Sequence, residues 1–214
     1  MPVELWCARG VFMTQIRDDV VVLDIDKDQY HCLLDAAHQI RPEDDGRLTV
    51  DDEDTALELL ATALATTTPV EKPRIVPTVP TREVIPSAGG PVLEAFGAGI
   101  ALAVGTLAFK GRSLPDLTRT GSRRSHPGRS CDEATLHRIL ASSRRALPWI
   151  PFEGECLQRS FQMRRLLRGR GFEADWIFGV RTWPFAAHCW LQRDDLVVGD
   201  RLERVLRYTP IMVA

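Results

Sequence analysis

The sequence of 214 residues lacks both a marked positive charge and a long apolar run. Its formal net charge of -2 argues against a general nucleic-acid-binding protein, because such proteins are usually strongly basic. Its main uncharged apolar segment, 95–109, has 15 residues, whereas a membrane-spanning helix needs about 20. We therefore expect a buried helix here and no stable membrane insertion.

The sequence also lacks paired cysteines and a secretory signal. Its five cysteines are scattered, with no two separated by only two residues, and an odd number does not build a complete disulfide framework. No basic segment followed by an apolar run opens the chain. These features predict reduced thiols and a cytoplasmic location.

Charge is distributed unevenly along a chain whose overall composition, 44% hydrophobic and 26% charged, is that of a globular protein. Residues 1–60 carry 15 acidic and 5 basic side chains, whereas residues 110–214 carry 19 basic and 11 acidic ones. The intervening residues 61–109 have three of each. We expect two units with different partners, at 1–68 and 92–214.

Between these units, residues 69–91 hold six of the fourteen prolines. A proline every three to six residues supports neither a helix nor a central strand, so this segment is predicted to be an extended linker.

The first unit reads as a small sheet followed by helices. The run 20–25 is rich in β-branched residues between acidic turns, which predicts a strand that forms a hairpin with 11–16. A third strand is expected at 29–33, a short helix at 34–40, and a second helix over 49–64 that begins with an acidic turn.

The second unit reads as helices followed by strands. Apolar spacing predicts helices over 132–147 and 154–168, and strands over 172–180, 187–192 and 196–200. The whole chain is therefore expected to be an α+β protein.

Three residues of the second unit suit nucleophilic catalysis. Cys156 lies in the first turn of a predicted helix, where the free N–H groups and the helix dipole favour a thiolate. His188 and Asp200 lie on neighbouring predicted strands, whose antiparallel pairing about a turn near residue 194 brings them side by side. A thiolate attacks a carbonyl, an imidazole moves the proton, and a carboxylate orients the imidazole.

Other interpretations of these residues stay open at this stage. A free cysteine is often an inert core residue, and both His188 and Asp200 are compatible with structural roles. Cys156, His188 and Cys189 are zinc-ligand types without the usual spacing. Cys131, which precedes an acidic helix start, is a rival nucleophile, although no suitably placed histidine follows it.

The segments around these residues resemble the transglutaminase-like cysteine peptidases of lasso-peptide biosynthesis, which remove the leader from a ribosomal precursor peptide. The segments are Gly154-Glu155-Cys156-Leu157-Gln158-Arg159-Ser160, Phe185-Ala186-Ala187-His188-Cys189-Trp190-Leu191 and Val198-Gly199-Asp200. The resemblance implies a transglutaminase-like, papain-like domain with Cys156 as nucleophile, His188 as base and Asp200 as its orienting group. Cys189 departs from the family, which often has a small residue after the histidine.

The first unit is similar to the leader-recognition element of the same family, a small winged helix-turn-helix-like unit with a three-stranded sheet plus helices. The similarity is carried by Val20 to Leu33. We expect a leader peptide to add a strand along 29–33. The predicted leader-binding residues are Gln29, Tyr30, His31, Cys32, Leu33 and Leu34.

The resemblance also implies partners: the precursor peptide and an ATP-dependent macrocyclase resembling asparagine synthetase. The chain itself contains no GxxxxGK[ST] phosphate-binding loop, and neither a cofactor nor a metal is predicted for it. Oxyanion donors are not identifiable, with the backbone N–H of Cys156 and the side chain of Gln158 as guesses.

The function expected from the sequence is therefore that of a thiol leader peptidase. Two alternatives stay open: a catalytically silent module that delivers a peptide to a partner macrocyclase, and an acyl-transferring transglutaminase. The last uses the same triad and differs in whether an amine or water resolves the acyl-enzyme.

Overall fold

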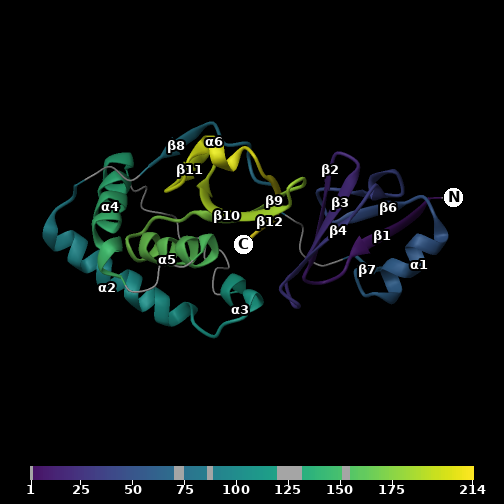
Figure 1. Ribbon diagram of the computed structural model, residues 1–214, viewed down its shortest axis with the longest axis horizontal. Coiled ribbons are helices and arrows are strands. Elements are labelled where there is room, and N and C mark those ends of the chain that lie inside the picture. The colour runs from purple at the N-terminus through teal and green to yellow at the C-terminus, as the bar shows by residue number, and fades with distance from the viewer. Residues whose placement is uncertain (1, 70–74, 86–88, 120–131, 151–154) are drawn as a thin grey trace.

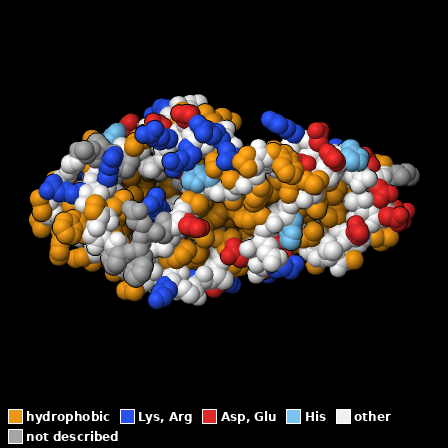
Figure 2. All heavy atoms as spheres, viewed as in Figure 1, with side chains coloured by type: hydrophobic (Ala, Val, Ile, Leu, Met, Phe, Trp, Pro, Cys, Tyr) orange, Lys and Arg blue, Asp and Glu red, His pale blue; other side chains and the backbone are white. Residues whose placement is uncertain are grey.

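The computed structural model describes residues 2–69, 75–85, 89–119, 132–150 and 155–214, and it confirms the predicted α+β class. Strand-rich N-terminal residues form one end of the molecule, and helices α2 to α5 form the other (Figure 1). Acidic side chains gather at the N-terminal end, while basic side chains are concentrated over the other half (Figure 2).

The N-terminal half contains two sheets. One has the order β2-β3-β4, and the other has the order β5-β6-β1-β7. Their strands are β1 Val3–Cys7, β2 Val11–Ile16, β3 Asp19–Asp24, β4 Gln29–Leu33, β5 Ile40–Pro42, β6 Arg47–Val50 and β7 Ala65–Thr66. The single α-helix described here is α1, Glu53–Ala61, whose first N–H groups are capped by the Asp52 side chain.

The predicted hairpin and third strand of this half are confirmed as β2, β3 and β4. The remaining four strands went unpredicted because each has only two to five residues, and the pairs that β1 makes with β6 and β7 join segments far apart in the chain. The expected helix at 34–40 is instead a single 3₁₀ turn, Ala36–His38, since β5 begins at Ile40. This half therefore has seven strands where a three-stranded sheet plus helices was expected.

The C-terminal half is built on a five-stranded sheet of order β12-β9-β10-β11-β8. The strands are β8 Arg82–Val84, β9 Asp175–Arg181, β10 Ala186–Arg193, β11 Leu196–Val198 and β12 Thr209–Val213. The helices are α2 Val92–Phe109, α3 Leu114–Arg119, α4 Glu133–Ala146, α5 Cys156–Gly169 and α6 Leu202–Val205, with a 3₁₀ turn at Leu147–Trp149.

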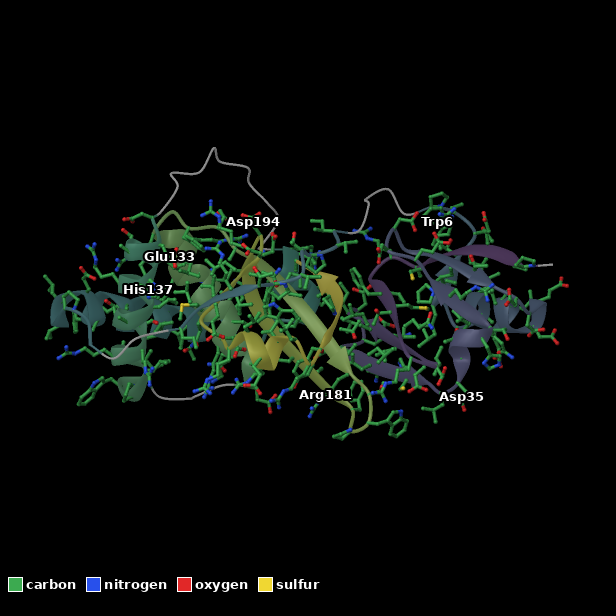
Figure 3. All side chains as sticks on the ribbon, turned by 90° about the horizontal axis from the view of Figure 1, so that it is seen from above. Trp6, Asp35, Glu133, His137, Arg181 and Asp194 are labelled. Atoms are coloured by element: carbon green, nitrogen blue, oxygen red, sulfur yellow. The ribbon has the colours of Figure 1, made fainter. Side chains whose placement is uncertain are left out.

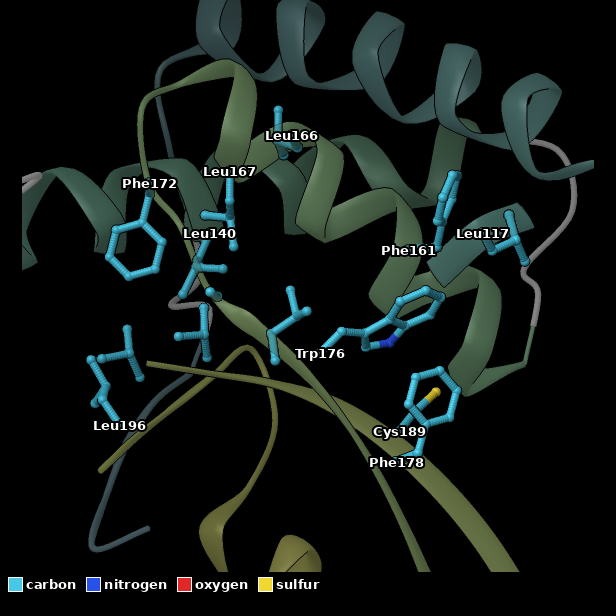
Figure 4. Packing of buried hydrophobic residues seen from close by; sticks show 14 of the residues in the cluster. Leu117, Leu140, Phe161, Leu166, Leu167, Phe172, Trp176, Phe178, Cys189 and Leu196 are labelled. Atoms are coloured by element: carbon cyan, nitrogen blue, oxygen red, sulfur yellow. The ribbon is translucent and has the colours of Figure 1, made fainter. Parts of the chain in front are cut away.

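Helix α5 packs on one face of this sheet, and α2 and α4 pack behind it. The interface between α5 and the sheet is aromatic: the Trp176 ring lies 6.0 Å from that of Phe161 and 4.8 Å from that of Phe178 (Figure 4). On the opposite face, Trp190 and Ile177 pack with Val205 of α6. The two faces of β10 therefore have different neighbours.

Residues 82–84, which fall in the segment expected to be a linker, form β8. This strand pairs in parallel with β11 at the edge of the sheet, where the flanking prolines do not interrupt it. The parts of the linker at 70–74 and 86–88 lie outside the described residues. The domain limits 1–68, 69–91 and 92–214 stay a prediction.

Helix α2 corrects the expectation of a buried helix. Its buried residues Ala95, Ala98, Leu102 and Gly105 lie on one face, and Gly105 is needed because a Cβ there would lie 3.1 Å from Gln162 Cγ. The outer face exposes large apolar side chains, with Leu93 83% exposed. By length and composition α2 is apolar enough to cross a membrane, with a mean hydropathy of 1.9 over 18 residues, of which 22% are buried.

The two halves share one hydrophobic cluster. Strand β3 is buried on both faces: Val20 and Val22 pack into the N-terminal core, whereas Val21 and Leu23 pack into the same cluster as the C-terminal sheet. Across this interface, Trp183 Nε1 donates a hydrogen bond of 2.8 Å to an Asp19 carboxylate oxygen. The halves are therefore docked through the β2-β3-β4 sheet.

Candidate active site

Cys156 is the first residue of α5. Within this helix the first turn contains no acidic side chain, and the residue preceding it, Glu155, makes no capping hydrogen bond. The free N–H groups and the positive end of the helix dipole therefore stabilise a thiolate at Cys156, and no carboxylate within the first turn of α5 counteracts them. Cys156 is half-buried, so a substrate carbonyl can reach it.

His188 and Asp200 lie side by side, as the strand pairing predicted. His188 Nε2 and Asp200 Oδ2 are 2.6 Å apart, and the two side chains are only 11% and 15% exposed. Because Nε2 is held by the carboxylate, Nδ1 is the ring nitrogen that remains for the Cys156 thiol, which lies within hydrogen-bonding reach of the imidazole.

The turn that carries Asp200 is supported by β8. The Gly199 N–H donates a hydrogen bond of 2.8 Å to the Val84 carbonyl, and the Leu202 N–H donates to the Glu83 carboxylate. Gly199 has a φ of 78°, in the left-handed region that glycine adopts without strain. Asp200 Oδ1 accepts a further hydrogen bond from the Arg201 N–H at 2.7 Å, which fixes the carboxylate toward His188.

Cys189 follows His188 on β10 and lies on the face of the sheet that α5 covers. It is buried, and its sulfur lies 3.3 Å from Ser160 Oγ, which also accepts a hydrogen bond of 2.8 Å from Trp176 Nε1. Hydrogen bonding from the Cys189 thiol is the largest cause that lowers the pKa of Cys156, and the Cys189 backbone N–H adds to it. The departure from the family pattern at Cys189 thus supplies a second thiol that acts electrostatically on Cys156.

The electrostatics of the site favour a thiolate–imidazolium pair. Hydrogen bonds from Cys189 and then His188 lower the pKa of Cys156 well below its ordinary value, outweighing burial. The pKa of Cys189 is raised, because it donates to Cys156 and is buried. Burial disfavours the imidazolium, but the hydrogen bonds with Asp200 and Cys156 prevail and raise the pKa of His188 to about 9.

Two aromatic rings flank the imidazole on the α6 face of the sheet. The His188 ring lies 5.2 Å from the Tyr208 ring and 6.1 Å from the Trp190 ring. Gly179 is the cross-strand partner of His188, and a Cβ there would come within 2.7 Å of Trp190 and 3.0 Å of Tyr208. The sequence analysis missed these three residues, although a glycine inside a predicted strand is a recognised sign of close approach.

The predicted leader-binding residues lie on or next to β4, at the edge of its sheet. Three of these six residues are exposed: Gln29, His31 and Leu34, the last to 59%. The other three are half-buried: Tyr30, Cys32 and Leu33. Among the described residues no strand pairs with the outer edge of β4. That edge therefore presents unpaired backbone groups of the kind that an added strand uses.

Some predicted features fall outside this site. Cys131, the rival nucleophile, and Gly154, the predicted helix start, lie outside the described residues. Gln158 Nε2 is buried and has no hydrogen-bond partner within the described part of the chain. No group of three or more histidine, cysteine or acidic residues that could hold a metal ion occurs in the described ranges.

Comparison with known proteins links the C-terminal half to one family. Residues 101–213 match the model of the transglutaminase-like superfamily. A stretch of 49 residues is 37% identical to the Microcin J25-processing protein McjB of Escherichia coli, and this stretch covers 23% of the present chain and 24% of McjB. The aligned region thus spans about a quarter of that relative. No solved structure matches this chain.

Proposed function

We propose that this chain, which belongs to the transglutaminase-like superfamily, is a thiol peptidase. In this proposal it removes the leader from a precursor in lasso-peptide biosynthesis. The observation that carries this proposal is the His188–Asp200 contact of 2.6 Å, together with the effect of His188 in lowering the pKa of Cys156 at the start of α5. The partial similarity to a microcin-processing protein supports the class of substrate.

The proposed chemistry has two steps. In the first, the Cys156 thiolate attacks the carbonyl of the last leader residue, and the His188 imidazolium gives its proton to the departing amine as the C–N bond breaks. In the second, neutral His188 takes a proton from water, which attacks the thioester. The leader leaves with a new carboxylate, and the thiolate–imidazolium pair is restored.

Asp200 acts through His188 in this scheme. Its pKa is lowered, since hydrogen bonds from His188 and the Arg201 N–H outweigh burial, so it remains a carboxylate throughout the reaction. The negative charge stabilises the imidazolium and keeps Nδ1 directed at Cys156. Cys189 contributes by donating its proton to the thiolate in a hydrogen bond while staying protonated itself.

Leader recognition is proposed for the outer edge of β4, with Gln29–Leu33 as the pairing strand. Backbone pairing gives affinity without regard to sequence, while side-chain contacts select the leader. A partner macrocyclase, as the family resemblance implies, closes the ring on the released core peptide.

Two experiments test this function. Iodoacetamide should label Cys156 selectively at pH 6, where an ordinary thiol is almost wholly protonated; slow, uniform labelling of all cysteines would favour the silent binding module. Mass spectrometry of a precursor encoded in a neighbouring reading frame should show two fragments whose masses together exceed the precursor by one water. A product joined to an added amine would instead identify a transglutaminase.

A further inference from the structure

The first residues of β10, which lie between α5 and β4, are only partly covered by other elements. Alternate residues of a strand point to the same face, so Ala187 lies on the face that carries Cys189, beneath the nucleophile. Cys189 is buried, but Ala187 is exposed, and Phe185 directly before the strand is 47% exposed. The covering layer therefore ends between Cys156 and the turn at 182–185.

The N-terminal half lies on the other side of the first residues of β10. The Tyr30 ring of β4 lies 5.9 Å from the Phe185 ring, tilted by 59°. Trp183 of the same turn is held by its hydrogen bond to Asp19 yet stays 68% exposed. In Figure 3, Arg181 marks the end of β9 from which this turn continues, far from Glu133 and His137 of α4.

The same surface lies close to the nucleophile. The pKa of Tyr30 is raised, first by burial and then by nearby negative charge that includes Asp28 and the Cys156 thiolate. Its phenol is thus near enough to sense the charge on Cys156. Aromatic side chains from both halves consequently line the space between the nucleophile and the edge of β4.

We propose that Tyr30, Phe185 and Ala187 form a subsite, here called the aromatic shelf, that binds a large apolar side chain of the substrate. This inference rests on the proposed peptidase function. The leader precedes the cleaved bond, so a leader that runs from β4 to Cys156 crosses the shelf with residues on the acyl side of that bond.

The length of the shelf sets the position of this side chain. Cys189 is four positions after Phe185, which corresponds to about 13 Å along a strand at about 3.3 Å per residue. An extended substrate advances by about the same length per residue. The apolar residue therefore lies about four positions before the cleaved bond.

The test uses acetylated hexapeptides whose C-terminal amide carries 7-amino-4-methylcoumarin, with alanine at every position save one phenylalanine. We expect phenylalanine at the fourth residue before the coumarin to raise kcat/KM about tenfold over the all-alanine peptide, as burial of a partly exposed ring predicts. Phe185→Ala should remove this preference, so that its kcat/KM values for the phenylalanine peptide and for the all-alanine peptide become equal. An unchanged midpoint of urea unfolding shows that the variant is folded.

A matched control is Phe96→Ala, which removes a phenylalanine that is 70% exposed on the outer face of α2. It should keep the preference, and Phe185→Leu, which retains an apolar side chain, should keep part of it. Equal hydrolysis of all peptides by the parent, or a preference that survives Phe185→Ala, overturns the shelf.

The same design separates the shelf from the peptidase function. If the parent cleaves neither the hexapeptides nor a precursor, the peptidase proposal fails and the shelf fails with it. If the parent cleaves only the full precursor, Phe185→Ala and Phe96→Ala are compared on that substrate. Equal rates there overturn the shelf and leave the peptidase function intact.

Discussion

Replacing Asp200 by asparagine tests how the proposed site works, because the change keeps the shape of the side chain and removes its charge. The His188–Asp200 hydrogen bond of 2.6 Å is the main contribution that raises the pKa of His188 to about 9 against burial. Without the carboxylate, the pKa of His188 should fall, because its largest stabilising partner is gone while burial still disfavours the imidazolium. The amide can also hold the imidazole in the wrong tautomer.

The magnitude has two parts. The wrong tautomer and weaker stabilisation should reduce kcat on the order of 10²–10⁴ at every pH. The lowered pKa adds a loss that depends on pH, because the active form requires imidazolium. With a pKa of about 9 in the parent and a lower pKa in the variant, this extra loss is absent at low pH and grows as the pH rises toward 9.

The assay measures precursor cleavage from pH 5.5 to 9.5, with leader binding in parallel. The parent should lose activity above pH 9 as His188 deprotonates, and the variant should lose it at least one pH unit earlier, with unchanged leader affinity. Asp194→Asn is the control, since Asp194 is an exposed turn residue with a φ of 53°, which asparagine tolerates. An Asp200→Asn enzyme with the parent rate and profile would show that Asp200 does not act on His188.

Four further outcomes are expected. Cys156→Ala should abolish cleavage while leader affinity, measured by fluorescence anisotropy, stays unchanged; residual cleavage would exclude Cys156 as the nucleophile. Gly179→Ala should lower kcat at least tenfold with little change in KM, because the added Cβ displaces the aromatic rings that flank His188. A variant with the same kcat and KM as the parent would show that those rings do not position the imidazole. Leu23→Ala should cost about 2–5 kcal/mol in the free energy of unfolding in urea, within one cooperative transition, because the side chain is wholly buried; two separate transitions would contradict a shared core. Four Gly-Ser residues inserted between 75 and 76 should leave the cleavage rate within twofold, and a larger loss would mean that this segment positions the site.

The strand that docks the two halves was found from local sequence, but its double burial was not. The prediction of a strand at 20–25 is confirmed to within one residue by β3, because turns at Arg17-Asp18 and Ile25-Asp26-Lys27-Asp28 bound it at both ends. The unbroken apolar run Val20–Leu23 is typical of a strand covered on both sides. Sequence alone does not show what covers it, since the C-terminal cluster comes from residues far along the chain.

The adjacency of His188 and Asp200 was predictable because a short turn joins their strands. The register, in which Leu191 pairs with Val198, places Asp200 just past the end of β11, and the distance of 2.6 Å between the two side chains agrees with the expected adjacency. The contacts of Trp183 with Asp19 and of Phe185 with Tyr30 were not predictable. Each joins segments more than 150 residues apart, and no local pattern encodes such pairing.

The docking of the two halves changes how leader binding assists cleavage. A flexible linker would raise the local concentration of the cleaved bond, with a gain that depends on linker length. Here Val21 and Leu23 are buried in the cluster of the C-terminal sheet, so β4 is held at a fixed distance from Cys156. Under the proposed function, the fold itself then determines the number of leader residues between the β4-bound segment and the cleaved bond. We therefore expect a precursor with the right spacing to deliver its carbonyl to the thiolate, and a peptide of different spacing to bind β4 equally well but to be cleaved slowly.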